Sequence, residues 1–187
     1  DVKIGGSCGG RDGTPNTAQQ LRAQAYRACD CANKAYAFFS NPDNPRRASR
    51  NHSNTYPLGL WVMGNHSREE LDALSNKLAK VFKGTRDACK SGFFIECTCN
   101  CKADVVANVG GVFDRVLYGR PLMNLCPIFF EEKRGYKTIF HELTHIGAGT
   151  DDDSSSQDNI NNLAKNAHTV TDIGDSICEI ADAYVAE

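Results

Sequence analysis

The chain has 187 residues, of which 41% are hydrophobic and 24% charged, a composition typical of a folded globular domain rather than a disordered chain. The formal net charge of -2 argues against a broad basic surface for nucleic acid, and no apolar run approaches the roughly 20 residues that span a bilayer. We therefore expect a single domain over residues 1–187, a monomer without a nucleic-acid or membrane partner.

Nine cysteines are spread along the chain, at Cys8, Cys29, Cys31, Cys89, Cys97, Cys99, Cys101, Cys126 and Cys178. They do not form two CxxC pairs at zinc-ribbon spacing, so disulfide bonds in an oxidising compartment explain them better. The odd number leaves at least one cysteine free or bonded to another chain. Glycosylation motifs at Asn51 and Asn65, and a start at Asp1 without methionine, are typical of a processed glycoprotein. We therefore predict a secreted, extracellular protein.

The first half of the chain is predicted to contain two helices and a short strand. The residues before Thr17 read as a loop, and apolar residues with helical period predict a helix from about Thr17 to Phe39. A strand is predicted at Leu58–Met63. Ser67 and Glu70 have the spacing of a capping box, so a second helix should begin there and end near Gly84.

The second half is predicted to contain strands followed by helices. The predicted strands are Phe93–Cys99, Val105–Val109, Val112–Tyr118 and Leu122–Phe130; the predicted helices begin near Tyr136 and span roughly 157–167 and 171–185. Helices at both ends with strands between them predict an α+β fold with a small, mostly antiparallel sheet. We expect a lobe of helices and sheet at 1–135 and a helical segment that carries the functional motif at 136–187.

The motif HELTH, at His141–His145, has the spacing of a zinc site. On a helix the two histidines, four residues apart, share one face and can reach one ion. Glu142 lies beside the open coordination position, where it can take a proton from a zinc-bound water. The competing explanation is a chance match in a structural, disulfide-rich protein. The apolar flanks, Phe140 and Leu143 among them, favour a buried metal-binding helix.

A catalytic zinc needs a third protein ligand, and two aspartates compete for that role. In the pattern HExxHxxGxxD the ligand would be Asp151, but position 148 is alanine instead of the glycine that permits the backbone turn. In the second pattern, Gly149-Thr150-Asp151-Asp152 is read as GTxD and the ligand is Asp152.

HELTH followed by GTDD resembles the aspzincin metallopeptidases, which include deuterolysin and the fungal peptidyl-lysine metalloendopeptidases. The similarity extends to an N-terminal cysteine with its helix, an aromatic-glycine strand at 60–64, the CTC segment at 97–99, Cys126, and a diverged NAD[ST] motif at 173–176. The resemblance implies a zincin-like fold with an HExxH active-site helix and one catalytic Zn²⁺.

The resemblance also assigns roles to individual residues. It implies His141, His145 and Asp152 as zinc ligands and Glu142 as general base. It implies that Asp175 supports the metal shell or favours a basic substrate side chain, although a helix-surface acid is an equally good explanation. It further implies the disulfide pairs Cys8–Cys97 and Cys99–Cys126.

One departure from the family pattern bears directly on activity. The family's GTxDxxYG places a tyrosine, which donates to the oxyanion, where this chain has Ser155. Losing one such donor typically costs about 10²–10³ in rate; Tyr136 and Tyr184 are candidate replacements. Two hypotheses follow. The leading one is a secreted zinc endopeptidase acting on protein or peptide substrates and favouring basic residues near the scissile bond. The alternative is a protease-like zinc-binding module that has lost turnover.

Overall fold

The structure is a computed structural model that describes residues 1–9, 17–48, 58, 62, 66–99, 101–102, 104–111, 117–131, 135–152 and 160–185, without the side chains of 161 and 180–185. The glycosylation candidates Asn51 and Asn65 and the residue Ser155 lie outside the described residues, as do most of the strands expected at 58–63 and 112–118. Within 58–63, the backbone N–H of Val62 donates to the carbonyl of Leu58 at 2.9 Å. That four-residue spacing belongs to a helical turn, which contradicts a strand there.

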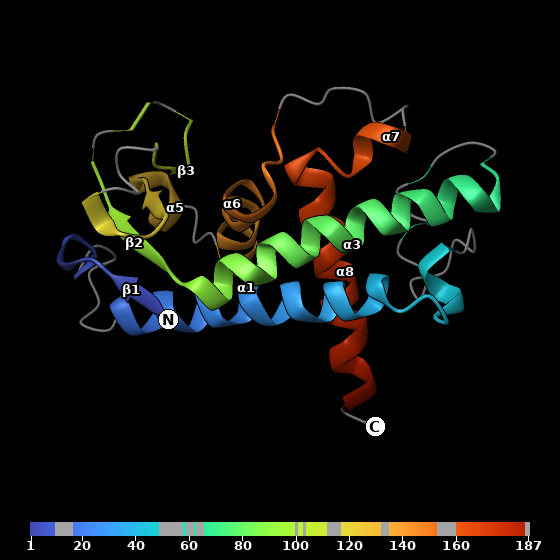
Figure 1. The fold of residues 1–187 in the computed structure, drawn as a ribbon. Helices are drawn as coiled ribbons and strands as arrows, with labels where there is room; N and C mark the ends of the chain where they lie inside the picture. The colour runs from blue at the N-terminus through green and yellow to red at the C-terminus, as the bar shows by residue number, and fades with distance from the viewer. Residues whose placement is uncertain are drawn as a thin grey trace.

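Two long helices, α1 (Thr17–Ser40) and α3 (Arg68–Ser91), lie side by side and form the largest layer of the fold (Figure 1). The capping box predicted for α3 is confirmed: Ser67 Oγ accepts from the Glu70 N–H at 3.2 Å, and Glu70 Oε2 accepts from the Ser67 N–H at 2.8 Å. The end predicted near Gly84 is wrong, because α3 continues for two more turns. Gly84 lies instead at a close crossing with another helix.

A small sheet covers one end of these helices. Its strands are β1 (Val2–Ile4), β2 (Phe93–Cys97), β3 (Ala107–Val109) and β4 (Leu122–Leu125), in the spatial order β1-β2-β4-β3. The pairs β1–β2 and β2–β4 are parallel, and only β3–β4 is antiparallel. The prediction of a mostly antiparallel sheet is therefore wrong. A three-residue N-terminal strand has no detectable period, and sequence alone does not reveal which way distant strands pair.

The remaining helices follow the sheet. They are α5 (Pro127–Glu131), α6 (Tyr136–Ala148), α7 (Ile160–Leu163) and α8 (Ala167–Val185); short 3₁₀ turns occupy Gly6–Cys8 and Pro45–Ala48. The strand predicted to continue to Phe130 ends instead before Pro127, since proline cannot donate to a strand ladder and suits the first position of a helix. Helix α6 begins at the predicted residue, and α8 begins four residues earlier than predicted.

The core is continuous between the helices. Phe82 of α3 stacks between Phe39 of α1 and Phe140 of α6, with ring centroids 5.7 Å and 6.2 Å away. Gly174 of α8 presses on the Phe140 ring, where a Cβ would lie 2.5 Å from a ring carbon. Helix α8 crosses α1 and α3 in Figure 1, so these contacts join all the long helices and fix the position of α6.

Four disulfide bonds staple the fold: Cys8–Cys97, Cys29–Cys89, Cys31–Cys178 and Cys101–Cys126. The first is the pair that the family resemblance implied. The implied pair of Cys99 with Cys126 is wrong, because Cys101 lies opposite Cys126 with its Cα 5.9 Å away, and exposed Cys99 stays outside the four bridges. The alternating CTCNC motif makes these two cysteines indistinguishable by spacing. The disulfide pattern fits an extracellular protein.

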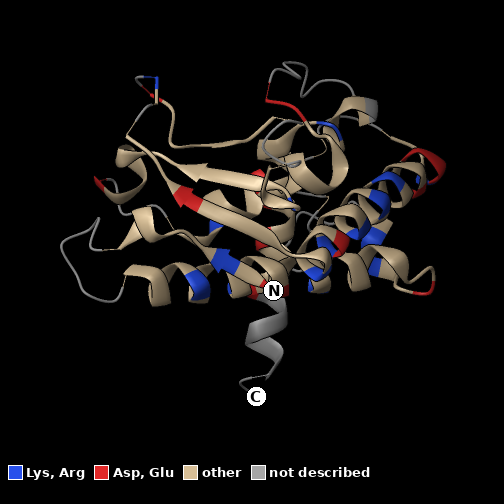
Figure 2. Cartoon of the chain, turned by 60° about the vertical axis from the view of Figure 1, so that its left-hand side comes forward, with Lys and Arg blue, Asp and Glu red and all other residues tan. Residues whose placement is uncertain are grey.

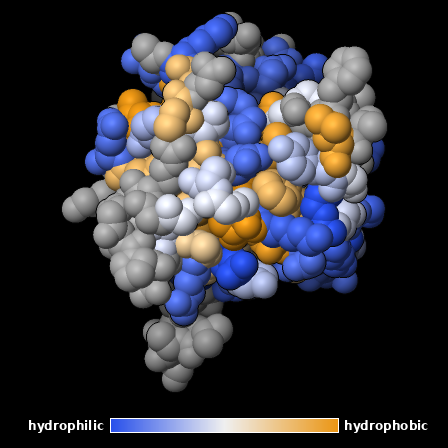
Figure 3. Space-filling model, turned by 90° about the vertical axis from the view of Figure 1, so that its left-hand side faces the viewer, coloured by the Kyte–Doolittle hydropathy of each residue, from blue (hydrophilic) through white to orange (hydrophobic). Residues whose placement is uncertain are grey.

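The surface carries mixed charge. Lys and Arg are spaced along the two long helices, among Asp and Glu (Figure 2), and several form pairs one helical turn apart, such as Lys83 with Asp87. On the side of the sheet, hydrophobic residues gather in small groups among hydrophilic ones (Figure 3). Scattered apolar residues of this kind are ordinary for a protein surface. No helix within the described part of the chain has the length and hydrophobicity needed to cross a membrane.

Candidate metal centre

Helix α6 places the two histidines of HELTH on one face. Ile139, Phe140 and Leu143 are fully buried and turn the opposite face toward the core, so His141 and His145 lie on the outer face, where His141 lines a pocket. The helix ends at Gly149, which adopts the left-handed conformation with φ 64° and whose N–H donates to the His145 carbonyl at 3.1 Å. This cap reverses the chain and directs the GTDD segment back toward the histidines.

The structure brings three metal-ligating atoms together. Oδ1 of Asp152 lies 2.9 Å from Nε2 of His141 and 3.4 Å from Nε2 of His145. The two Nε2 atoms are 3.1 Å apart. Within the described residues, these three side chains form the group whose ligand atoms could hold a metal ion. They are the three residues that the family resemblance implied as zinc ligands.

Asp151, the other candidate, has a different position. Its N–H donates to the Lys165 carbonyl at 2.9 Å, and its carbonyl accepts from the Ala167 N–H at 2.9 Å. These two bonds form a parallel bridge that ties the GTDD segment to the start of α8. Because the bridge fixes the backbone of Asp151, the next residue, Asp152, is the one that faces the histidines.

A second layer of contacts orients the ligands. Nδ1 of His145 lies 2.6 Å from the Thr150 carbonyl oxygen. A carbonyl can only accept, so Nδ1 carries the hydrogen and Nε2 keeps its lone pair for a metal. The buried hydroxyls of Thr144 and Thr150 are 2.7 Å apart, and Thr144 also donates to the His141 carbonyl at 2.8 Å. These contacts link the helix to the GTDD segment directly behind the ligands.

The donor set fits a zinc ion. Zinc–ligand bonds of about 2.0–2.1 Å in a tetrahedron imply ligand atoms roughly 3.3–3.4 Å apart, close to the 2.9–3.4 Å observed between these three atoms. Without a cation or proton between them, the two Nε2 lone pairs and the carboxylate would repel one another. Two imidazoles and one carboxylate also leave a fourth position for water or substrate, as in catalytic zinc sites.

Burial sets the protonation of the residues around the centre. It lowers the pKa of His141 to about 4, although the Asp152 charge acts in the opposite direction, so this imidazole is unprotonated at neutral pH. Burial also raises the pKa of Glu142 to about 7; Asp152 adds to this effect and His145 opposes it. Glu142, whose exposed fraction is 6%, is therefore poised between its acid and base forms near neutral pH.

The three candidate ligands lie beside a pocket of about 490 Å³, which His141 and Asp152 line. Its walls are the segment 104–107 that leads into β3, the first half of α6, the first turns of α8, and Asp152. Glu142 lines it, and so do two further acids, Asp104 and Asp172. The pocket therefore combines metal ligands, a titratable carboxylate and space for a ligand.

The sequence profile of the lysine-specific metallo-endopeptidase family, the aspzincins, matches residues 48–172, which is more than half of the chain. The chain belongs to this family. Aspzincins are metalloendopeptidases, so peptide or protein substrates and a metal, typically zinc, follow for the family as a whole. Among curated proteins, no sequence matches this chain.

In this aspzincin a third histidine, which sequence reasoning missed, lies beside the metal cluster. Nε2 of His168, in the first turn of α8, is 3.7 Å from Oδ1 of Asp152, and its ring centroid is 4.5 Å from that of His141. Its side chain is 70% exposed and lines the pocket. The available signal was the small number of histidines, five in the whole chain.

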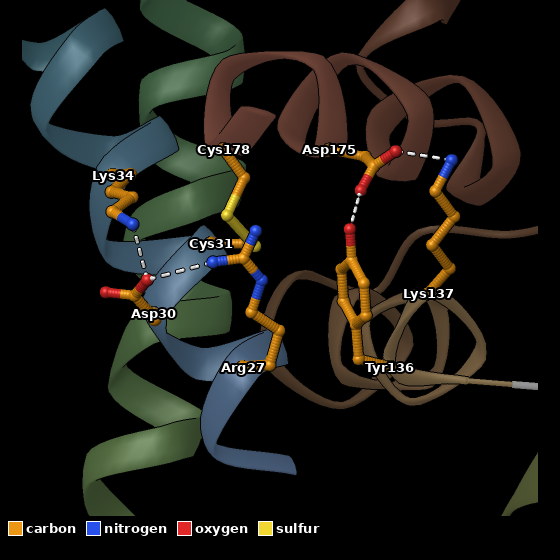
Figure 4. Close-up of a disulfide and its surroundings, with 8 residues drawn as sticks. All are labelled: Arg27, Asp30, Cys31, Lys34, Tyr136, Lys137, Asp175 and Cys178. Carbon is orange, nitrogen blue, oxygen red and sulfur yellow. Dashed lines mark hydrogen bonds and ion pairs between the residues drawn. A yellow bond between two sulfur atoms is a disulfide. The ribbon is translucent and has the colours of Figure 1, made fainter. Parts of the chain in front are cut away.

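Asp175, the remaining predicted site residue, is not among the three clustered ligands. It is buried on α8, and its two carboxylate oxygens accept from the Tyr136 hydroxyl and the Lys137 ammonium at the start of α6 (Figure 4). Burial and this bond to Asp175 raise the pKa of Tyr136 to about 12. Tyr136, a candidate replacement for the family tyrosine, is thus engaged with Asp175, and the Tyr184 side chain lies outside the described residues.

Proposed function

We propose that this protein is a secreted, zinc-dependent endopeptidase in which Glu142 is the general base. The supporting observation is the convergence of His141, His145 and Asp152 beside a buried glutamate at the floor of a pocket. A site that only stores zinc has no need for a carboxylate with a raised pKa next to its ligands. The four disulfide bonds support an extracellular location.

Each residue of the site has a defined part in hydrolysis. A zinc ion held by His141, His145 and Asp152 supplies Lewis-acid chemistry, polarising the scissile carbonyl and lowering the pKa of water. Glu142 accepts the proton of the attacking water and passes it to the leaving amine nitrogen. Its pKa near 7 suits both steps, since it can take and return a proton at neutral pH. Thr150 holds His145 in the tautomer that binds metal.

The preference for basic residues near the scissile bond is supported by the pocket's acids. Asp104 and Asp172 line the pocket and are available to attract a cation. The GTDD segment adds exposed Asp151, which precedes the proposed ligand Asp152. Asp175, which the family resemblance linked to this preference, is paired with Lys137, so a substrate cation would have to displace an internal one.

The alternative function, a zinc-binding module with little or no turnover, has one observation in its favour. Ser155 stands where the family pattern has the tyrosine that donates to the oxyanion. If no other donor replaces it, the rate falls by about 10²–10³. Tight zinc binding without cleavage of varied substrates would favour this alternative.

The test is cleavage of an unfolded, lysine-rich protein with and without a zinc chelator, followed by mass spectrometry of the fragments. Chelator-sensitive cleavage is expected. Glu142→Gln should retain zinc and lose about 10²–10⁴ in rate, the contribution of a general base. Glu131→Gln, an exposed glutamate at the end of α5, is the matched control and should cleave normally. Cleavage that survives in the Glu142 variant would contradict the mechanism.

A further inference from the structure

The buried carboxylate of Asp175 already holds a lysine. Its side chain is 5% exposed, and Figure 4 shows it between two groups of α6: Oδ1 accepts from the Tyr136 hydroxyl and Oδ2 from the Lys137 ammonium. Both partners come from the first turn of the helix that carries the metal ligands. This corner of the molecule is therefore built to bind an ammonium group.

The lysine that carries this ammonium group lies one helical turn before His141. Lys137 precedes His141 by four residues on α6, so both side chains lie on the same helix face. Lys137 lines the same pocket as Glu142 and Asp172. The bond to Asp175 raises the pKa of Lys137, and the charge of Asp172 acts in the same direction. A substrate side chain bound in this pocket would therefore meet the Lys137 ammonium.

Helix α1 supports the position of Asp175 and of its partner Tyr136. Cys178, one turn after Asp175 on α8, is bonded to Cys31 of α1 (Figure 4). The guanidinium of Arg27, also on α1, lies 5.4 Å from the centroid of the Tyr136 ring. Because α1 is linked to the helix of Asp175 and contacts the ring of Tyr136, the carboxylate should keep its position beside Lys137, which lines the pocket, when its cation leaves.

We propose that Lys137 occupies from within the subsite in which a substrate lysine would bind, so that this protein lacks the lysine selectivity for which its family is described. The proposal rests on the proposed function in naming a substrate subsite. The Lys137 ammonium competes with a substrate lysine for Asp175, at an effective concentration in the mM range. A substrate lysine whose dissociation constant is higher than this concentration is therefore kept out of the subsite. The wild-type pocket then accepts small or uncharged side chains at this subsite and leaves a looser preference for cations to Asp104 and Asp172.

Removing the internal lysine should open the subsite. Lys137→Met keeps most of the length of the side chain and removes its charge. Lys137→Ser is a second variant that lets water reach Asp175, in case the uncompensated carboxylate prevents the first from folding. Lys83→Met is the matched control, because Lys83 is also a lysine paired with an aspartate, is 57% exposed against 54% for Lys137, and lies on α3.

The first readout is independent of activity. Binding of n-butylammonium, which reproduces a lysine side chain, is measured by NMR on metal-free and zinc-loaded protein. We expect binding at least about tenfold tighter in either Lys137 variant than in the wild type or the Lys83 variant. Adding Asp175→Asn to the Lys137 variant should abolish the gain. Equal binding by the wild type and a folded Lys137 variant would overturn the proposal.

The second readout maps cleavage sites in a lysine-rich substrate. The wild type should show no strict selection of lysine, and the Lys137 variants should shift their cleavage toward lysine. Strict lysine selection by the wild type would overturn the proposal, whatever the variants do. If neither the wild type nor any variant cleaves the substrate, the peptidase proposal fails. Butylammonium binding then still decides whether the lysine subsite exists.

Discussion

Replacing Gly84 by alanine should force helices α3 and α6 apart. A Cβ at Gly84 would lie 2.2 Å from the carbonyl oxygen of Gly147, and a Cβ at Gly147 would lie 2.4 Å from the carbonyl oxygen of Gly84. Ordinary contacts begin near 3.4 Å, so the two backbones must separate by about 1 Å, and overpacking of this kind costs about 1–3 kcal/mol. The new Cβ has no rotamer and the oxygen that it meets belongs to the main chain, so no side-chain movement relieves the clash.

The sign of the effect makes the test decisive. At an uncrowded helix position, alanine would stabilise the protein by about 0.5–1 kcal/mol relative to glycine. We expect Gly84→Ala instead to lose about 2 kcal/mol, which lowers the melting temperature by about 4–8 °C for a chain of this size. Calorimetry at fixed pH measures it, with Gly6→Ala, where a Cβ meets nothing within 4 Å, as the control. A melting temperature equal to or above that of the wild type would refute the close-crossing argument.

Other predictions concern the metal centre and its supports. Replacing a residue that hydrogen-bonds to a metal ligand weakens metal binding by roughly 10–100-fold, and Asp152→Ala, which removes a ligand itself, should weaken zinc binding by more. Asp151→Ala keeps the backbone bridge and should leave zinc binding nearly unchanged. Calorimetric titration with zinc compares the two variants. Burial raises the pKa of Glu142 from 4.5 to about 7, so the stability its protonated form contributes is present below pH 4.5 and lost as pH rises through 7. In metal-free protein above pH 7, Glu142→Gln should therefore be more stable than the wild type by up to about 3 kcal/mol in denaturant titrations; equal stability at every pH would contradict the burial argument. Replacing Cys31 and Cys178 by alanine should cost about 2–5 kcal/mol, seen as an earlier unfolding midpoint.

Features that depend on neighbouring residues could be predicted from the sequence. The capping box at Ser67 and the helix that begins at Tyr136 are recognisable because their signals lie within a few residues of one another. The same holds for His141 and His145, since a spacing of four residues on a helix brings two side chains together whatever the rest of the chain does. The choice of Asp152 came from the family resemblance, because the spacing alone left Asp151 open.

Features that depend on contacts between distant segments could not be predicted from the sequence. The sequence does not distinguish a glycine that ends a helix from one that allows two helices to pack closely, so the helix end predicted at Gly84 is wrong. The direction of strand pairing needs both strands in place. The choice between Cys99 and Cys101 depends on where Cys126 lies, because alternating cysteines have equivalent spacings. His168 reaches the metal cluster because a backbone bridge draws the start of α8 to the GTDD segment.

The sequence by itself determined the HELTH helix with its two histidines and glutamate, and the disulfide-bonded character of the protein. Only the tertiary structure decided what surrounds that helix: that His168 lies beside Asp152, and that Asp175 is paired with Lys137. The physical reason is the distance along the chain over which each interaction acts. Helical period and capping act over one or two turns of chain, whereas the charges and contacts that shape the pocket come from segments that meet only when the core packs.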